Sequence, residues 1–188
     1  MKMNLGCGRD IKEGWVNVDL ISGDGVDVVL DLDQPKPFEL ADENTVDVFL
    51  VSHLIEHLQH PLPLAEAMWR AAKPDAVAIF RCPHGASDDA DEDPQHVRRM
   101  FPHSWDYFGQ PAYHRADYGY RGDWRTDEVK LRCRPERMGE TNAETYELIG
   151  MERNIVVEMQ VLLRAVKPAR PQTPDASDSM HIVIEAIE

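Results

Sequence analysis

Gly6, Gly8 and Asp19 are the residues whose types and spacing most clearly indicate a ligand site. The two glycines follow a short apolar segment, Met3–Leu5, and Asp19 ends the next one, Trp15–Asp19. Glycine lacks a Cβ, so a backbone that contains it can turn tightly after a strand and approach a ligand closely. A carboxylate at the end of the neighbouring strand can accept hydrogen bonds from a ribose diol. The pattern predicts a nucleoside-type ligand at the carboxyl ends of parallel strands.

The predicted site extends to the next two apolar segments. Asp31 lies near the end of Val26–Leu32, where it could flank an adenine ring, and Ser52 and His53 follow Val46–Val51. A simpler interpretation is that the glycines only make a turn and the acids only end strands. The predicted cofactor-binding set is Leu5, Gly6, Cys7, Gly8, Asp19, Leu20, Asp31, Leu32, Ser52 and His53.

A nicotinamide dinucleotide is the obvious competitor, but the spacing argues against it. Its fingerprint needs a third glycine, where this chain has Ile11, and an acid about 20 residues further on, whereas Asp19 follows Gly8 closely. The connector of residues 9–14 is too short for a crossover helix, whose N-terminus would hold a pyrophosphate. S-adenosylmethionine carries a cationic sulfonium and no phosphate, so it depends less on that helix.

The segment from His53 to His57 also fits H-x-x-E-H, an inverted zinc-peptidase pattern. That chemistry would need both histidines on one helical face, a third ligand, and Glu56 as general base. Because the segment follows a predicted buried strand, we favour a loop that lines the cofactor pocket at Ser52 and His53. A metal-dependent hydrolase built on the histidines stays as an alternative, and we predict no metal ligand.

Alternating short apolar segments and connectors favour an α/β fold with a mostly parallel sheet. Val77–Cys82 is the fifth predicted strand, and Pro61–Ala72 has helical periodicity after a proline-containing first turn. We expect a single domain, residues 1–188, with a loop-rich insertion at about 84–150. Within it we expect a short helix near 102–108, a strand at 128–134 and a helix at 142–150. Residues 154–166 and 181–187 predict an antiparallel hairpin around a proline-rich loop.

Composition limits the remaining possibilities. The net charge of −14 disfavours binding to bulk nucleic acid. No apolar run approaches the roughly 20 residues that span a membrane, and the N-terminus lacks a signal-type pattern. Three widely spaced cysteines, Cys7, Cys82 and Cys133, suggest reduced thiols and a cytoplasmic location.

The glycine and Asp19 segments resemble the opening of class I S-adenosylmethionine-dependent methyltransferases, in particular small bacterial and phage members with a shortened first connector. The stretches 31–33, 46–48 and 52–58 resemble that family too, as do residues 93–108 on its acceptor side. The resemblance implies a Rossmann-like fold, S-adenosylmethionine as cofactor, and an oxygen or nitrogen acceptor on a small molecule or protein. A non-catalytic protein that only binds the cofactor is the remaining alternative.

The resemblance also indicates the acceptor side. It implies His96 as the catalytic residue, because imidazole can take a proton near neutral pH. It implies His84, Arg98 and Trp105 as substrate-binding residues. Aromatic side chains between 105 and 120 could stack on a planar acceptor, although most are expected to form the insertion's own small core.

Overall fold

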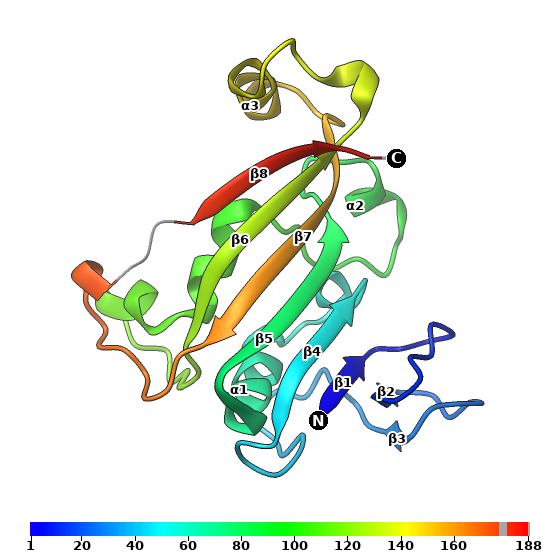
Figure 1. The fold of residues 1–188 in the computed structure, drawn as a ribbon, viewed down its shortest axis with the longest axis vertical. Helices are drawn as coiled ribbons and strands as arrows, with labels where there is room; N and C mark the ends of the chain where they lie inside the picture. The colour runs from blue at the N-terminus through cyan, green and yellow to red at the C-terminus, as the bar shows by residue number, and fades with distance from the viewer. Residues whose placement is uncertain (177–179, 188) are drawn as a thin grey trace.

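The computed structural model describes residues 1–176 and 180–187 and contains one eight-stranded mixed sheet (Figure 1). The strand order is β3-β2-β1-β4-β5-β7-β6-β8. The strands are β1 (Lys2–Leu5), β2 (Val16–Asp19), β3 (Val28–Val29), β4 (Val46–Ser52), β5 (Ala72–Pro83), β6 (Trp124–Cys133), β7 (Val156–Ala165) and β8 (His181–Ala186). The helices are α1 (Pro61–Ala71), α2 (Asp89–Glu92) and α3 (Asn142–Met151), with 3₁₀ turns η1 (Ile55–His57), η2 (Pro102–Phe108), η3 (Gln110–His114), η4 (Pro135–Arg137) and η5 (Pro174–Ala176).

The N-terminal half forms the predicted parallel sheet. β1 lies between β2 and β4, and β4 pairs with β5, all in parallel. β4 and β5 bury alternate side chains, among them Phe49, Val51, Ala78 and Phe80, and α1 packs its buried face against the sheet. β3 is only Val28–Val29, much shorter than the predicted Val26–Leu32, because its side chains lie exposed at the sheet edge.

The C-terminal half contains an antiparallel hairpin, as predicted, but with a different partner. β7 pairs antiparallel with both β5 and β6, so the hairpin consists of β6 and β7. β8 pairs in parallel with β6 at the far edge and does not contact β7 as a neighbouring strand. The expected pairing of residues 154–166 with 181–187 is therefore wrong, since β6 occupies the position between them.

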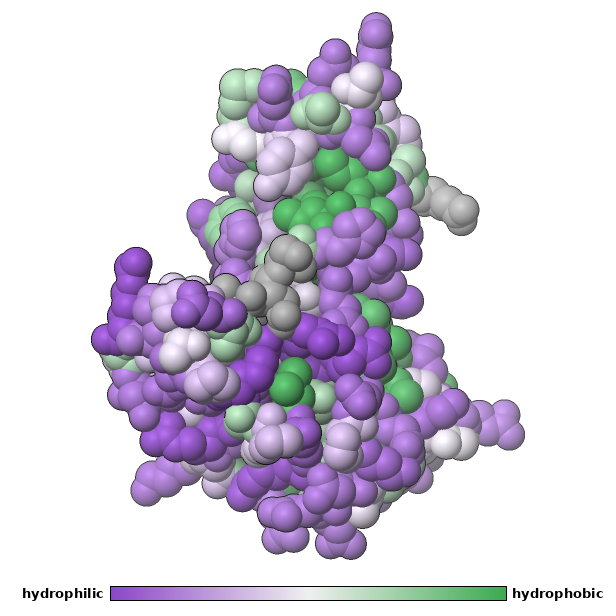
Figure 2. Space-filling view, turned by 60° about the vertical axis from the view of Figure 1, so that its left-hand side comes forward, coloured by the Kyte–Doolittle hydropathy of each residue, from purple (hydrophilic) through white to green (hydrophobic). Residues whose placement is uncertain are grey.

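The insertion is shorter than predicted because the ten residues of β6 belong to the sheet. Its irregular part, residues 84–123, contains α2, η2 and η3, and covers one end and one face of the sheet (Figure 1). The predicted helices near 102–108 and 142–150 are present as η2 and α3. Among the described residues, no helix is both long and apolar enough to cross a membrane. Figure 2 shows a largely hydrophilic surface with a hydrophobic patch in its upper part, below α3.

Candidate cofactor and acceptor site

The glycine loop turns sharply where β1 ends. Gly6 and Gly8 have φ angles of 67° and 51°, which L-residues rarely adopt. The N–H groups of Gly6 and Cys7 both donate to the carbonyl of Val18, at 2.9 and 3.0 Å, which holds the loop against β2. A Cβ at Gly6 would lie 3.0 Å from the Leu54 side chain, whereas one at Gly8 would meet no atom within 4 Å. The loop is thus packed on one side by the segment after β4 and open to a ligand at Gly8.

Asp19 lies beside this loop, as predicted. One carboxylate oxygen accepts from the N–H of Gly8 at 2.7 Å, and the other accepts from Ile21 at 3.1 Å. Each carboxylate oxygen can accept more than one hydrogen bond, so acceptor capacity remains for a ligand. Asp19 therefore shapes the glycine loop and presents negative charge beside it.

Two buried amide side chains, Asn4 and Asn17, hold the short connector in place. Asn17 Oδ1 accepts from the N–H of Lys12 at 2.9 Å and from Asn4 Nδ2 at 3.1 Å, and its own amide donates to the Lys12 carbonyl. Asn4 also donates to the carbonyl of Asp10 at 2.8 Å. Among the described residues no helix joins β1 to β2, so these amides replace its internal hydrogen bonds. Polar residues inside two apolar strands were the sequence signal for this role.

The other predicted cofactor residues lie along the same edge of the sheet in different environments. Leu5 is fully buried and Cys7 nearly so, so only their backbone can face a ligand, whereas Leu20 is 63% exposed. Asp31 is exposed and Leu32 is buried after the last residue of β3. Ser52 is half-buried at the end of β4.

His53 lies at the end of β4 within a group of acidic side chains. Its Nε2 is 3.1 Å from Glu158 of β7 and its Nδ1 is 3.3 Å from Glu56. These two carboxylates, Glu158 foremost, raise the pKa of His53 to about 9. The residue has a φ of 51° and precedes η1, which spans only Ile55–His57. The single helical face required by the zinc-peptidase pattern is therefore absent from this segment.

The three predicted substrate-binding residues do not converge. Trp105 is fully buried, with its ring packed on Phe80 at 4.9 Å between centroids, so it is a core residue rather than an acceptor contact. Arg98 lines one cavity, and His84 lines another, of about 530 Å³, beside α3. Sequence order could not separate them because the chain between 84 and 105 crosses from one cavity to the other.

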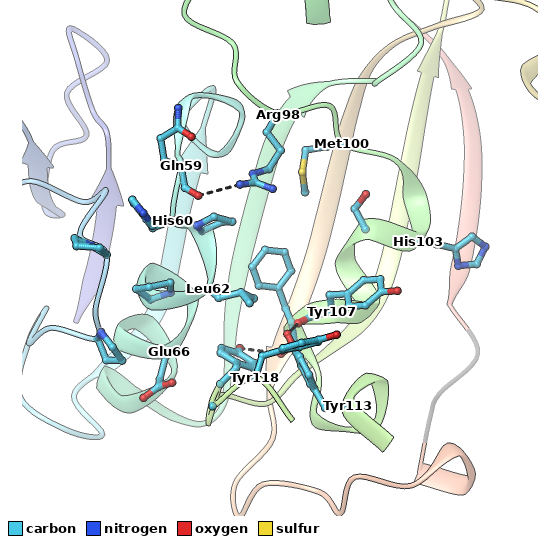
Figure 3. A pocket seen from close by; sticks show the side chains of 18 of the residues that line it. Gln59, His60, Leu62, Glu66, Arg98, Met100, His103, Tyr107, Tyr113 and Tyr118 are labelled. Atoms are coloured by element: carbon cyan, nitrogen blue, oxygen red, sulfur yellow. Dashed lines mark hydrogen bonds between the residues drawn. The ribbon is translucent and has the colours of Figure 1, made fainter. Parts of the chain in front are cut away.

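The cavity at Arg98 has a volume of about 820 Å³ (Figure 3). The guanidinium group donates to the carbonyls of Leu58 and Gln59, at 3.3 and 3.0 Å, so its position is fixed. Most of the lining is apolar or aromatic, and two exposed rings, Tyr107 and Tyr118, come from the insertion. The volume is that of a site for a small organic molecule.

This cavity is adjacent to the predicted adenine side. Asp33 accepts from the N–H groups of Gln59 and His60 at 3.0 and 2.7 Å, tying the segment after β3 to the start of α1. Pro35 and His60, on either side of this junction, line the cavity. Candidate cofactor and acceptor regions therefore share one wall.

His96 is near the end of β4 but is mostly enclosed. Its side chain is 9% exposed and its ring packs edge-on against His57, with centroids 4.7 Å apart. Glu56 lies in the same cluster, within which one ligand atom of each residue is within 4.8 Å of the others. In this arrangement the imidazole faces protein groups and not an open cavity.

No protein-family model matches the sequence, and no curated protein matches it. Solved structures do. A SAM-dependent methyltransferase from Archaeoglobus fulgidus is 16% identical over 87% of this chain and 85% of its own, with a TM-score of 0.58. A Burkholderia thailandensis 1,6-didemethyltoxoflavin-N1-methyltransferase, solved with its acceptor and S-adenosylhomocysteine, is 11% identical over 88% and 71%, with a TM-score of 0.53.

The chain has the S-adenosylmethionine-dependent methyltransferase fold. The same fold also occurs in the [4+2]-cyclase SpnF, which is 8% identical over 88% of this chain and 74% of its own, with a TM-score of 0.52. The methyltransferase fold accordingly does not fix the reaction by itself, and the activity has to be argued from the site.

Within this methyltransferase fold, His84 is expected to make stability sensitive to acid. Burial lowers the pKa of His84 to about 4 from 6.5, so the native side chain is neutral while the unfolded chain takes up a proton below about pH 6.5. Stability is therefore lost as pH falls from about 6.5 to about 4, by about 2 kcal/mol between pH 7 and pH 5.

Urea unfolding at both pH values would measure this effect in the wild type and in His84→Gln. We expect the wild type to lose about 2 kcal/mol more than the variant over this interval. His103→Gln, which removes a histidine that is 77% exposed, should behave as the wild type does. Equal losses in wild type and His84→Gln would show that His84 does not titrate between these pH values.

Proposed function

We propose that the chain, acting as one domain, is an S-adenosylmethionine-dependent methyltransferase whose acceptor is a small molecule with an oxygen or nitrogen nucleophile. The observation that carries the proposal is the open glycine loop beside Asp19, at the carboxyl edge of a sheet with methyltransferase topology. Ligands of open parallel sheets bind at that edge. The groups at this edge fit a nucleoside with a cationic sulfonium. Carboxylates can accept hydrogen bonds from the ribose and attract the positive charge, and the backbone of the glycine loop can approach the ligand closely.

Each part of the proposed site has a separate task. The loop at Gly6 and Gly8 would let the backbone lie close to the methionine part, Asp19 would accept from the ribose hydroxyls, and Asp31 with Leu32 would border the adenine. When bound, S-adenosylmethionine would supply an activated methyl group for an oxygen or nitrogen nucleophile of the acceptor. The protein mainly has to align the reactants and exclude water.

The cavity at Arg98 supports a small acceptor of partly aromatic character. Its lining rings, Tyr107 and Tyr118, offer flat apolar surfaces, and Arg98 adds a fixed positive charge. Such a combination suits a planar molecule that carries an anionic or carbonyl group. The residues that line the two regions would align the methyl donor and the acceptor. Because the ring of His96 is mostly enclosed and packs against His57 of η1, we assign no proton transfer to it.

Calorimetric titration with S-adenosylmethionine and S-adenosylhomocysteine tests the cofactor site, and two glycines offer a matched pair of variants. Gly8 and Gly14 both have positive φ angles, of 51° and 75°, and at both a Cβ would meet no atom within 4 Å. Gly8→Ala and Gly14→Ala should therefore cost similar backbone strain, about 1 kcal/mol. Only Gly8 adjoins the proposed ligand.

We expect binding to the wild type, at least tenfold weaker binding to Gly8→Ala, and little change for Gly14→Ala. A folded wild type that binds neither compound would refute the cofactor assignment. Equal effects of the two substitutions would show that strain alone, and not contact with the ligand, weakens binding. Tight binding with no turnover across a broad set of hydroxyl and amine acceptors would favour another reaction on this fold.

A further inference from the structure

Glu56, His57 and His96 form a compact cluster that the cofactor site does not use. Glu56 and His57 belong to η1 at the end of β4, and His96 comes from the insertion, 39 residues later. One ligand atom from each of the three lies within 4.8 Å of the other two. The two imidazole rings meet at 69° with centroids 4.7 Å apart, so they are not stacked face to face.

The cluster contains buried polar atoms that lack partners. Glu56 is 2% exposed, and neither of its carboxylate oxygens has a hydrogen-bond partner. His96 Nδ1 is likewise buried without one. The ion pair with His53 at 3.3 Å offsets only part of the charge of Glu56, because His53 also forms an ion pair with Glu158. A buried carboxylate beside a buried imidazole nitrogen, both without a hydrogen-bond partner, is costly, and a cation bound between them would lower that cost.

The backbone already holds the cluster together. The carbonyl of Glu56 accepts from the N–H groups of Val97 and Arg98, at 3.0 and 3.1 Å, so the segment after α2 is fixed against η1. A carboxylate oxygen of Asp93 lies 3.8 Å from Nε2 of His96, the other ring nitrogen. A carboxylate next to the second ring nitrogen commonly orients a metal-bound histidine.

We propose that Glu56, His57 and His96 bind a divalent transition-metal ion, with Zn²⁺ the best match. One carboxylate oxygen and two imidazole nitrogens are ligands that zinc takes, and three protein ligands leave a fourth position for one further ligand. Ligand atoms of a tetrahedral zinc lie roughly 3.3 Å apart, so a small contraction of the cluster would complete the site. Two of the three ligands come from the H-x-x-E-H stretch, but His96 takes the place of His53.

The ion would fasten the acceptor-side segment to the end of β4. His96 is two residues before Arg98, which lines the 820 Å³ cavity, so a metal bound at His96 would fix the position of that part of the cavity wall. A metal-bound imidazole has no lone pair left for a proton, so an occupied site excludes His96 as general base. Metal binding is measured without S-adenosylmethionine and so is independent of the proposed methyl transfer.

Tag-free protein, stripped with a chelator, would be titrated with Zn²⁺ alone in a calorimeter and with Co²⁺ in a spectrophotometer. We expect one Zn²⁺ per chain, a rise in the unfolding temperature with added zinc, and visible Co²⁺ absorption typical of a four-coordinate site. His96→Gln and Glu56→Gln should lower the affinity at least tenfold. His103→Gln, an exposed histidine of the same insertion, is the matched control and should bind as the wild type does.

A wild type that binds less than about a tenth of an equivalent of Zn²⁺ after desalting would overturn the proposal. So would zinc binding that His96→Gln and Glu56→Gln leave unchanged, since the ion would then lie elsewhere. If either variant fails to fold, the Co²⁺ spectrum of the wild type still decides, because an octahedral spectrum with weak absorption contradicts a four-coordinate site.

Discussion

Asp19→Ala is expected to weaken the binding of S-adenosylmethionine and S-adenosylhomocysteine by at least about 100-fold. In the proposed complex the carboxylate accepts from two ribose hydroxyls, and a hydrogen bond to a charged group contributes about 1.5–3 kcal/mol. The substitution also removes the acceptor for the N–H groups of Gly8 and Ile21, which shape the loop. Both effects act in the same direction, and calorimetry measures their sum.

Two further variants separate contact with the ligand from support of the loop. Asp19→Asn keeps one acceptor oxygen but loses the charge, and it should weaken binding by an intermediate amount. Asp24→Ala removes an exposed acid from the segment between β2 and β3 and should leave the affinity within about twofold of the wild type. If Asp19→Ala binds as tightly as Asp24→Ala, Asp19 is not part of the cofactor site.

The sheet was predictable from sequence where strands follow one another locally. β4 is a short and largely apolar segment, and α1 has clear helical periodicity. Pairing at the C-terminal end was not predictable in the same way. β6 and β7 alternate buried and more exposed residues, and β8 is partly buried along its four central residues, so the pattern identifies strands but not which of them are neighbours.

In the candidate site too, residues that are close in sequence were predictable, whereas contacts between distant segments were not. Gly6, Gly8 and Asp19 lie within 14 residues of each other, and their spacing carries the prediction. By contrast, the approach of His96 to Glu56 depends on how residues 58–95 cross the sheet, which no local pattern encodes. Trp105 was mistaken for an acceptor contact because a ring that fills a core and a ring that stacks on a ligand look alike in sequence.

Asn17→Ala is expected to lower the free energy of unfolding by about 2–4 kcal/mol. Its side chain is 3% exposed and carries hydrogen bonds to Asn4 and to both backbone groups of Lys12. Removing it would leave the Lys12 N–H without its acceptor and would take one of two acceptors from the buried Asn4 amide, which keeps the carbonyl of Asp10. Because no helix stiffens residues 9–14, those two groups cannot find other partners without moving the connector. Urea unfolding followed by circular dichroism would measure the change.

The matched control is Asn142→Ala, which removes an exposed amide at the start of α3 and should change stability by less than about 0.5 kcal/mol. The double variant with Asn4→Ala adds a second measurement. If the two amides act as one unit, the losses should be strongly non-additive, with a coupling of at least about 1 kcal/mol. A loss below about 1 kcal/mol for Asn17→Ala would mean instead that Asp27, which accepts from the Asn17 backbone N–H at 2.7 Å, holds the connector. The position of the connector would then depend on the segment just before β3 and not on the side chain of Asn17.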